Sequence, residues 1–217
     1  MQQTIRTRAG PALVEEHAPG SSLGAIERQA KDCRRCDLYK YATQLVFGEG
    51  RRDARLVLVG EQPGDKEDIA GRPFVGPAGV VLTDCLHEAD IERSDCYLTN
   101  AVKHFKYEQR GKRRLHSRPN AGEIQRCAWW LGAELDQLDP HVVVALGATA
   151  ARTLLGPSVK VTRDRGHPIA TDSRFTILVT IHPSYLLRIR DRQAATAERS
   201  RFIDDLKTAV KLAKGSE

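Results

Sequence analysis

The chain has 217 residues, enough for one domain of ordinary size with a substantial core. It is 41% hydrophobic and 29% charged, with a net charge of +6, which is typical of a soluble globular protein. No apolar run approaches the roughly 18 residues that cross a bilayer, and the first residues lack the apolar core of a secretory signal. These features exclude an integral membrane protein, and we expect a cytoplasmic protein that is a monomer by default.

Residues 1–20 have mixed charge, two prolines and no hydrophobic period, which predicts a loose tail before a single domain over residues 21–217. Ser21 or Ser22 can cap a helix that runs to about Asp32. Short apolar runs predict four strands: Leu56–Val59, Cys96–Thr99, Val142–Leu146 and Thr176–Thr180. Helical spacing predicts further helices near Ala78–Glu88, Ala121–Leu138, Thr149–Leu155 and Ala194–Ala213.

Strands that alternate with helices are typical of an α/β fold. The third and fourth predicted strands are almost continuously apolar, which indicates strands buried on both faces of a mainly parallel sheet. We therefore expect a three-layer α/β/α sandwich around a central four-stranded sheet. Such sheets bind ligands beyond the carboxyl ends of their strands, so polar residues at those ends are the candidates for function.

The excess positive charge is concentrated in one stretch of the chain. Between Lys103 and Arg118 there are seven Lys or Arg residues against a single acidic residue, Glu108, so this stretch matches the net charge of the whole chain. A basic run can be a solvated surface, or it can lie against the phosphates of a nucleic acid. The candidate phosphate-binding residues are Lys112, Arg113 and Arg114.

Four polar or aromatic motifs follow the predicted strands. The segment GEQPGD (residues 60–65) combines a rigid turn with the carboxylates of Glu61 and Asp65. The segment GRPFVGPAG (residues 71–79) holds Phe74 where a flat ring can stack on a base. Asn100 offers a donor and an acceptor that match the edge of a uracil ring, and His182 can donate to an oxygen that gains charge. Taken singly, each residue also has an ordinary structural interpretation.

Together, GEQPG, GRPFVGPAG, TNAVK and HPSYLLR resemble, in this order, the motifs of the family-4 uracil-DNA glycosylases. The similarity runs from Cys33 to about Arg188, which is most of the chain. It implies the fold of that family and the excision of uracil from DNA.

The resemblance also implies roles for individual residues. Phe74 would stack on uracil, Asn100 would read its edge, and His182 would steady the charge on the leaving base. The loop with Gly60, Glu61 and Gln62 would line the pocket.

Family-4 enzymes carry a [4Fe–4S] cluster on four cysteines, and the resemblance implies this cofactor here. Cys33 and Cys36 form a C-x-x-C pair, and Cys127 takes the place on the following helix. The remaining place, after TNAVK, is held by His104. Because imidazole can replace thiolate on iron, we expect a cluster with three cysteines and one histidine; a zinc site with the same ligands is the alternative.

The basic stretch is longer than the usual family-4 connection, and its KRRLH segment (residues 112–116) resembles the signature loop of the UdgX branch. Members of that branch remove uracil and then stay joined to the abasic site through the loop histidine, here His116. Gln62 stands where some related glycosylases carry a water-activating carboxylate, and Glu61 or Asp65 would orient His116 or accept its proton.

Two alternatives to covalent capture remain open from the sequence. The first is a conventional hydrolytic glycosylase, in which His116 is a surface residue of a loop that grips DNA. The second is a module that binds uracil or abasic DNA without chemistry.

Overall fold

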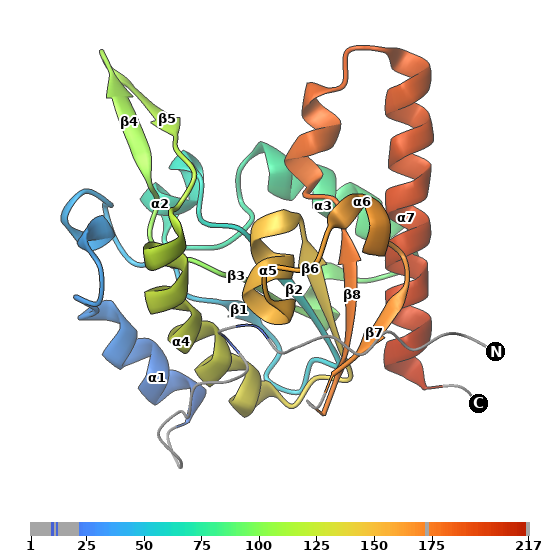
Figure 1. The fold of residues 1–217 in the computed structure, drawn as a ribbon, viewed down its shortest axis with the longest axis horizontal. Coiled ribbons are helices and arrows are strands. Elements are labelled where there is room, and N and C mark those ends of the chain that lie inside the picture. Colours follow the sequence, from blue (N-terminus) through green and yellow to red (C-terminus); the bar gives the residue numbers. More distant parts are fainter. Residues whose placement is uncertain (1–9, 11, 13–21, 172–173, 216–217) are drawn as a thin grey trace.

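A six-stranded sheet with the strand order β1-β3-β2-β6-β8-β7 lies at the centre of the fold (Figure 1). This computed structural model describes residues 10, 12, 22–171 and 174–215. The four inner strands are parallel and confirm the four strands predicted from the sequence: β2 (Leu56–Gly60), β3 (Cys96–Asn100), β6 (Val142–Leu146) and β8 (Thr176–Thr180). Their carboxyl ends therefore meet at one edge of the sheet.

Short antiparallel strands extend the sheet on both sides. β1 (Glu49–Gly50) pairs with β3, and β7 (Pro168–Ala170) pairs with β8. The sheet thus has six strands, and the prediction of four was incomplete. Strands of two or three residues are too short to show an alternating hydrophobic pattern, so the sequence gives no signal for them.

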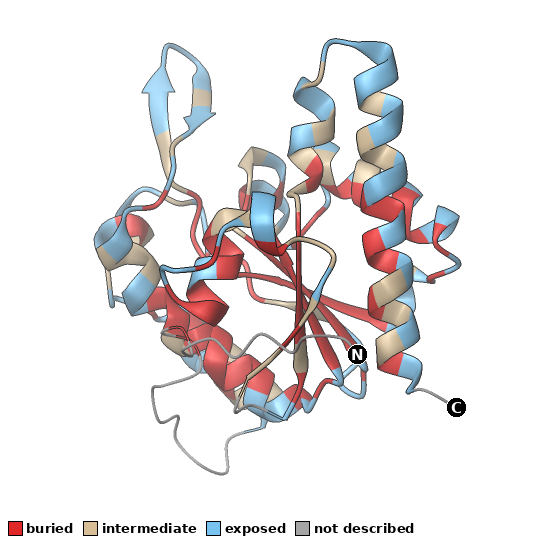
Figure 2. Ribbon diagram, turned by 45° about the vertical axis from the view of Figure 1, so that its right-hand side comes forward, coloured by how far each residue is buried: buried red, intermediate tan, exposed pale blue. Residues whose placement is uncertain are grey.

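Helices cover both faces of the sheet, which confirms the three-layer sandwich. Val57 and Val59 of β2 face the core under α4 (Ala121–Leu138) and α5 (Ala148–Leu155), with α1 (Leu23–Lys31) packed on α4. Leu56 and Leu58 face the opposite core, under α3 (Pro77–Glu88) and α7 (Arg192–Lys214). Because successive strand side chains point to opposite faces, each inner strand contributes to both cores, and all its residues are buried except Thr176 at the start of β8 (Figure 2).

Capping explains where the first helix begins. The Ser22 side chain accepts a hydrogen bond from the backbone N–H of Ala25, so Ser22 is the N-cap of α1. The predicted tail over residues 1–20 lies outside the described residues, apart from Gly10 and Ala12. The division into a tail and one domain therefore stays a prediction.

Short helices connect the main elements around the strand ends. They are η2 (Asp37–Lys40), α2 (Asp65–Ala70), η3 (Arg93–Asp95), α6 (Val161–Asp164) and η4 (Pro183–Arg188). In the part of the chain that the structure describes, no helix combines the length and the apolar character needed to span a membrane.

The basic stretch after β3 forms a β-hairpin that projects beyond the sheet (Figures 1 and 2). β4 (Tyr107–Arg110) pairs with β5 (Arg113–His116) around a two-residue turn, where Gly111 has a φ of 57°. A positive φ at this position is what a tight hairpin turn requires, and glycine adopts it without strain. A loop was expected from the sequence, whereas the structure has a hairpin, which fixes the side chains that share a face.

Candidate active site

A cavity of about 1300 Å³ opens at the carboxyl ends of the inner strands. It is lined by residues from the four predicted motifs and from the hairpin, among them Glu61, Phe74, Asn100, His116 and His182. The structure therefore brings together side chains that lie up to 121 positions apart in the sequence, from Glu61 to His182. This is the edge of the sheet at which α/β proteins bind their ligands.

Gly60 forms the point where the two candidate base-binding residues converge. A Cβ atom added to Gly60 would overlap the Asn100 side-chain oxygen and would lie 2.7 Å from Cζ of Phe74. Only a residue without a side chain lets Asn100 and Phe74 approach the backbone of this loop so closely. Gly60, Phe74 and Asn100 therefore meet at one point, which we call the cradle, and it offers an aromatic ring beside a polar amide.

Phe74 is held in an uncommon backbone conformation at the wall of this cradle. Its φ is 54°, a region that non-glycine residues rarely adopt, and its side chain is buried. The loop that carries it is tied down by Glu67, whose carboxylate accepts hydrogen bonds from Gly76 N at 2.8 Å and Gly64 N at 3.1 Å. Glu67 thereby joins the GRPFVGPAG loop to the GEQPGD loop.

His182 lines the same cavity, and its ring stacks beside the Phe74 ring at 6.3 Å, centroid to centroid. Burial lowers the pKa of His182 to about 4, and the nearby Arg188 and His116 act in the same direction. The ring is therefore neutral at neutral pH. Its Nδ1 accepts the Ser184 backbone N–H at 3.2 Å, so the single ring proton is on Nε2, where it can be donated to a ligand.

His116 ends the hairpin beside the carboxylate of Glu61. Its Nε2 lies 3.4 Å from Glu61 Oε1, and the His116 side chain is 51% exposed. The other oxygen of Glu61 accepts a hydrogen bond from the Thr149 hydroxyl and lies 3.8 Å from Nε of Arg118. The structure thus places Glu61, rather than Asp65, next to His116.

Gln62 fastens both ends of the hairpin to the GEQPGD loop. Its side-chain amide donates to the backbone oxygens of Lys106 and Ser117, each at 3.1 Å, and accepts from Lys106 N at 3.1 Å. Gln62 is buried, so these bonds occupy its polar group inside the protein. The amide predicted to replace a water-activating carboxylate therefore contacts the hairpin ends directly.

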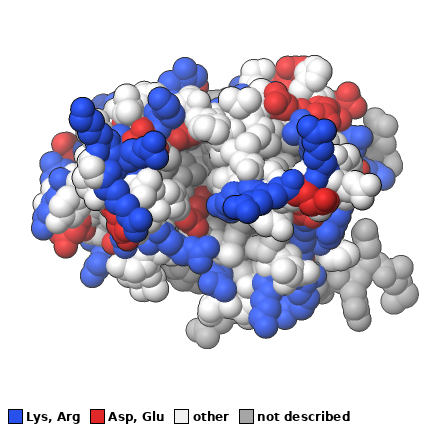
Figure 3. Space-filling view, turned by 90° about the horizontal axis from the view of Figure 1, so that it is seen from above, with Lys and Arg blue, Asp and Glu red and all other residues white. Residues whose placement is uncertain are grey.

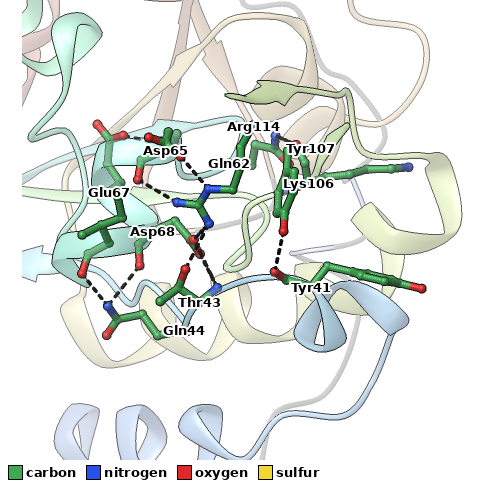
Figure 4. Close-up of polar contacts among 12 residues, drawn as sticks. Tyr41, Thr43, Gln44, Gln62, Asp65, Glu67, Asp68, Lys106, Tyr107 and Arg114 are labelled. Carbon is green, nitrogen blue, oxygen red and sulfur yellow. Dashed lines mark hydrogen bonds and ion pairs between the residues drawn. The ribbon is translucent and has the colours of Figure 1, made fainter. Parts of the chain in front are cut away.

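Arg114 holds the hairpin against α2 (Figure 4). Its guanidinium contacts Asp65 at 2.7 Å and Asp68 at 2.6 Å, and it packs over the rings of Phe105 and Tyr107. Asp68 is completely buried, and its carboxylate also accepts the Thr43 backbone N–H. Arg114 was predicted to bind phosphate, but the structure shows its charge engaged by these two carboxylates.

The tip of the hairpin presents the remaining predicted cations to solvent. Lys112 and Arg113 are exposed, and Arg113 points to the face of β5 opposite Arg114. Seen from above, Lys and Arg side chains gather on both sides of a hollow in the surface (Figure 3). Arg118, Arg188 and Arg201 line the cavity in that region. Cations therefore flank the cavity, whose wall also contains the carboxylates of Glu61, Asp65, Glu67 and Glu198.

The predicted metal ligands come from three segments: Cys33 and Cys36 follow α1, His104 precedes the hairpin, and Cys127 lies on α4. Cys33, Cys36 and Cys127 interact electrostatically, and burial raises the pKa of Cys127 to about 12. Two N–H groups point at these sulfurs, from the Trp130 indole to Cys33 and from the Lys103 backbone to Cys127, each at 3.1 Å. Such donors stabilise a thiolate once a metal has displaced the proton.

His104 is the one predicted ligand that is not a cysteine. It is buried, and burial lowers its pKa to about 4, opposed by the nearby Asp68. Among the residues that the structure describes, no three His, Cys, Asp or Glu side chains are arranged around a single ion. Metal ligation by Cys33, Cys36, His104 and Cys127 stays a prediction.

Several residues that shape the site were missed by the sequence analysis. Glu67, Asp68 and Thr149 act through hydrogen bonds to loops far away in the chain, and no local pattern marks such partners. One signal was present for Asp68: it lies three positions after Asp65 on α2, so both carboxylates share a face. That spacing is typical of a site for a cation such as Arg114.

Comparison of the sequence with known proteins assigns the chain to a family. Residues 47–207 match the family described as the Uracil DNA glycosylase superfamily. The chain is 41% identical to the type-4 uracil-DNA glycosylase of Thermotoga maritima, over 77% of this chain and 84% of that protein. It is 32% identical to the type-4 uracil-DNA glycosylase of Sulfurisphaera tokodaii, over 76% of each chain. The chain therefore belongs to the type-4 uracil-DNA glycosylases of that superfamily.

Proposed function

We propose that this protein excises uracil from DNA and then captures the resulting abasic site covalently through His116, as in the UdgX branch. The observation that carries the proposal is the single cavity in which the Phe74–Asn100 cradle, the neutral His182 and the His116–Glu61 pair face one another. The names of the type-4 relatives support uracil in DNA as the substrate.

The first step is cleavage of the bond between C1′ and N1 of uracil. Phe74 stacks on the flipped base, and Asn100 pairs with its polar edge. The electron pair of the bond leaves with the base, whose oxygen gains negative charge. His182 donates its Nε2 proton in a hydrogen bond to that oxygen, which a neutral ring does without needing a proton from solvent.

The second step joins the sugar to the protein. Departure of the base leaves an oxocarbenium-like sugar, and the lone pair of a neutral His116 nitrogen forms a new bond to C1′. The ring becomes an imidazolium and loses its remaining N–H proton. Glu61, at 3.4 Å from Nε2, accepts this proton, so that a neutral adduct remains. The uracil anion takes up a proton as it leaves the cavity.

Water competes poorly with His116 at this position. The neutral amide of Gln62 cannot act as a general base, and its hydrogen bonds to Lys106 and Ser117 already occupy it. The same bonds close the base of the hairpin and keep His116 at the cavity. One residue thus removes a route to hydrolysis and positions the competing nucleophile.

The DNA strand lies in the positively charged hollow between the hairpin and η4. Lys112 and Arg113 at the hairpin tip neutralise phosphates, which dominate the affinity for nucleic acid. Arg114 acts mainly by holding the hairpin, because its guanidinium is already paired with Asp65 and Asp68.

We also propose a [4Fe–4S] cluster held by Cys33, Cys36, Cys127 and His104. The three neighbouring thiols and the N–H groups that point at their sulfurs fit this group. When bound, the cluster supplies a covalent connection between the end of α1, the segment after β3 and α4. It takes no part in the excision step proposed here.

The decisive experiment uses a labelled DNA oligonucleotide with one uracil. The protein is incubated with it and run on a denaturing gel, with and without alkali. We expect a slow band that survives heat and detergent and that is missing when thymine replaces uracil. His116→Ser should abolish this band and yield an abasic product that alkali cleaves.

Other outcomes separate the alternatives. Alkali-sensitive DNA without a slow band from the wild-type protein would establish hydrolytic excision, and the hairpin would then only bind DNA. Tight binding with no chemistry, from protein shown to hold its metal, would establish a binding module. An adduct formed by His116→Ser would contradict the role of His116.

Elemental analysis tests the cluster separately. A brown protein that absorbs near ~400 nm and contains iron and sulfide supports the cluster. A colourless protein with one equivalent of zinc supports the alternative zinc site.

A further inference from the structure

A fully buried ion pair lies next to Asn100, one of the residues that line the cavity. Lys103 and Glu134 have side chains that are 0% exposed, and the Lys103 ammonium contacts the Glu134 carboxylate. The carboxylate also accepts hydrogen bonds from Gly48 N at 2.9 Å and from the Tyr97 hydroxyl at 3.2 Å. A pair this deep costs much desolvation and often contributes no net stability, so its position needs another reason.

The remaining hydrogen bonds of Lys103 reach the residue that faces the base. Its ammonium donates to the backbone oxygen of Asn100 at 2.9 Å and to the Thr99 hydroxyl at 2.7 Å. All three N–H donors of the ammonium therefore have acceptors, and one of them fixes the peptide unit that follows Asn100. The direction of the Asn100 side chain depends on that backbone.

The backbone of Lys103 connects the same segment to the cysteine group. Lys103 N donates to Cys127 Sγ at 3.1 Å, and Val46 N donates to the Lys103 oxygen at 2.8 Å. Between Asn100 and Lys103, the segment is bonded to the GEQPGD loop through Ala101 N to the Gly60 oxygen and Val102 N to the Glu61 oxygen, each at 2.9 Å.

We propose that Lys103 is a positioning residue that sets the uracil selectivity of Asn100. It clamps the Asn100 carbonyl from below, and it ties this clamp to Glu134 on α4 and to Cys127. The proposal rests on the proposed function only in assuming that Asn100 reads the base; it does not depend on covalent capture.

The test compares two double variants that each remove one Lys–Glu pair between the segment after β3 and α4. Lys103→Met with Glu134→Gln removes the clamp, while the glutamine can still accept from Gly48 N and Tyr97. Lys106→Met with Glu123→Gln is the matched control. Its ion pair, at 2.9 Å, joins the same two parts of the chain, but the Lys106 side chain has no bond to Asn100 or Cys127 among the described contacts.

Two readouts distinguish positioning from support of the fold. The first is the single-turnover rate of uracil excision. The second is binding selectivity, measured as the Kd for an oligonucleotide with thymine divided by the Kd for one with unreactive 2′-fluoro-deoxyuridine.

For the clamp variant we expect about a 10-fold to 100-fold loss in the rate and a lower Kd ratio, with unchanged affinity for the thymine oligonucleotide. The control should stay within about twofold of wild type in both. Thermal unfolding and metal content are measured on each protein.

A folded clamp variant with the rate and selectivity of the control would overturn the proposal. Should this variant fail to fold, Thr99→Val decides. It removes one acceptor of the Lys103 ammonium beside Asn100, together with the hydrogen bond from the Thr99 hydroxyl to Glu134 at 2.9 Å, and it keeps the ion pair. We expect about a fivefold loss of selectivity from it, and unaltered selectivity would overturn the proposal. Wild-type protein that prefers uracil without excising it would refute the proposed function alone. Wild-type protein with no preference for uracil would refute both.

Discussion

Arg114 and His116 lie two residues apart on β5 and therefore face the same side of the hairpin. Arg114 is bound by Asp65 and Asp68 of α2, while His116 lies 3.4 Å from Glu61. The ion pairs of the first residue thus determine where the second is held. Because both residues belong to a paired β-strand, the position of Arg114 fixes that of His116 more rigidly than it would in a loop.

Replacing Arg114 tests this relationship. Arg114→Met removes the contact with α2 and leaves the buried carboxylate of Asp68 without its cation, at a cost of about 3 kcal/mol in the free energy of unfolding. We expect covalent adduct to form at least about tenfold more slowly, because His116 is no longer held at the cavity. The measurement is the time course of the slow band on a denaturing gel.

Arg113→Met is the control for charge. It removes the same charge from the opposite, exposed face of β5 and should weaken DNA binding at low salt while leaving the rate of capture at saturating protein unchanged. Equal effects of the two substitutions on that rate would show that Arg114 acts only as a cation.

Gly60→Ala should close the base pocket. The added methyl group would overlap the Asn100 side chain and press on Phe74, so both base-binding side chains must shift, and we expect excision to fall by about 100-fold or more. Overpacking should lower the free energy of unfolding by about 1–3 kcal/mol. Excision is followed by alkaline cleavage of the product strand, and folding by thermal unfolding.

A second glycine provides the comparison. Gly122 lies on α4, where an added Cβ meets only side-chain atoms of Asn120 and Arg126 at 3.4 Å or more. Gly122→Ala should excise uracil at the wild-type rate. Full activity of Gly60→Ala would mean that the base binds elsewhere in the cavity.

The layers of the fold and the residues of the cradle could be predicted, because both follow local patterns. The four inner strands contain short apolar runs, and Phe74, Asn100 and His182 lie in motifs at or after the strand ends. The hairpin was missed because its residues are polar on both faces, so they show no alternation of apolar and polar side chains.

Partners that are distant in the chain could not be predicted. The contacts of Arg114 and Gln62 are examples: Arg114 is paired with carboxylates of α2, and Gln62 with backbone groups of the hairpin. The type of a residue in a motif determines which bonds its side chain can make. The tertiary fold decides which of these bonds it does make.

The depressed pKa of His182 predicts a pH dependence of stability. The pKa of His182 in the folded protein is about 4, below the ordinary value of 6.5. Between these two pH values, the His182 side chain is protonated in the unfolded chain but not in the folded protein. The contribution of His182 to stability is complete above about pH 6.5 and is lost as the pH falls toward 4. His182→Gln should therefore show a smaller decline in Tm between pH 7 and pH 4 than wild type.

Thermal unfolding of both proteins across this pH range measures the difference. His104, which has a lowered pKa of its own, is present in both and cancels in the comparison. A steeper decline in Tm for His182→Gln would mean that His182 is charged in the folded protein. The assignment of a neutral ring with a proton on Nε2 would then be wrong.

Glu61→Gln tests the acceptor of the His116 proton. The glutamine keeps an oxygen for the Thr149 hydroxyl but lacks the charge that accepts a proton from the imidazolium. A general base typically accelerates such a transfer by about 100-fold or more, so we expect adduct formation to slow by that factor. Because His182 and Asn100 are untouched, free uracil should be released faster than the adduct accumulates.

Glu108→Gln controls for the loss of one negative charge, because Glu108 is an exposed residue on β4. This variant should form adduct at the wild-type rate. Adduct formation by Glu61→Gln at that same rate would assign the proton to water instead.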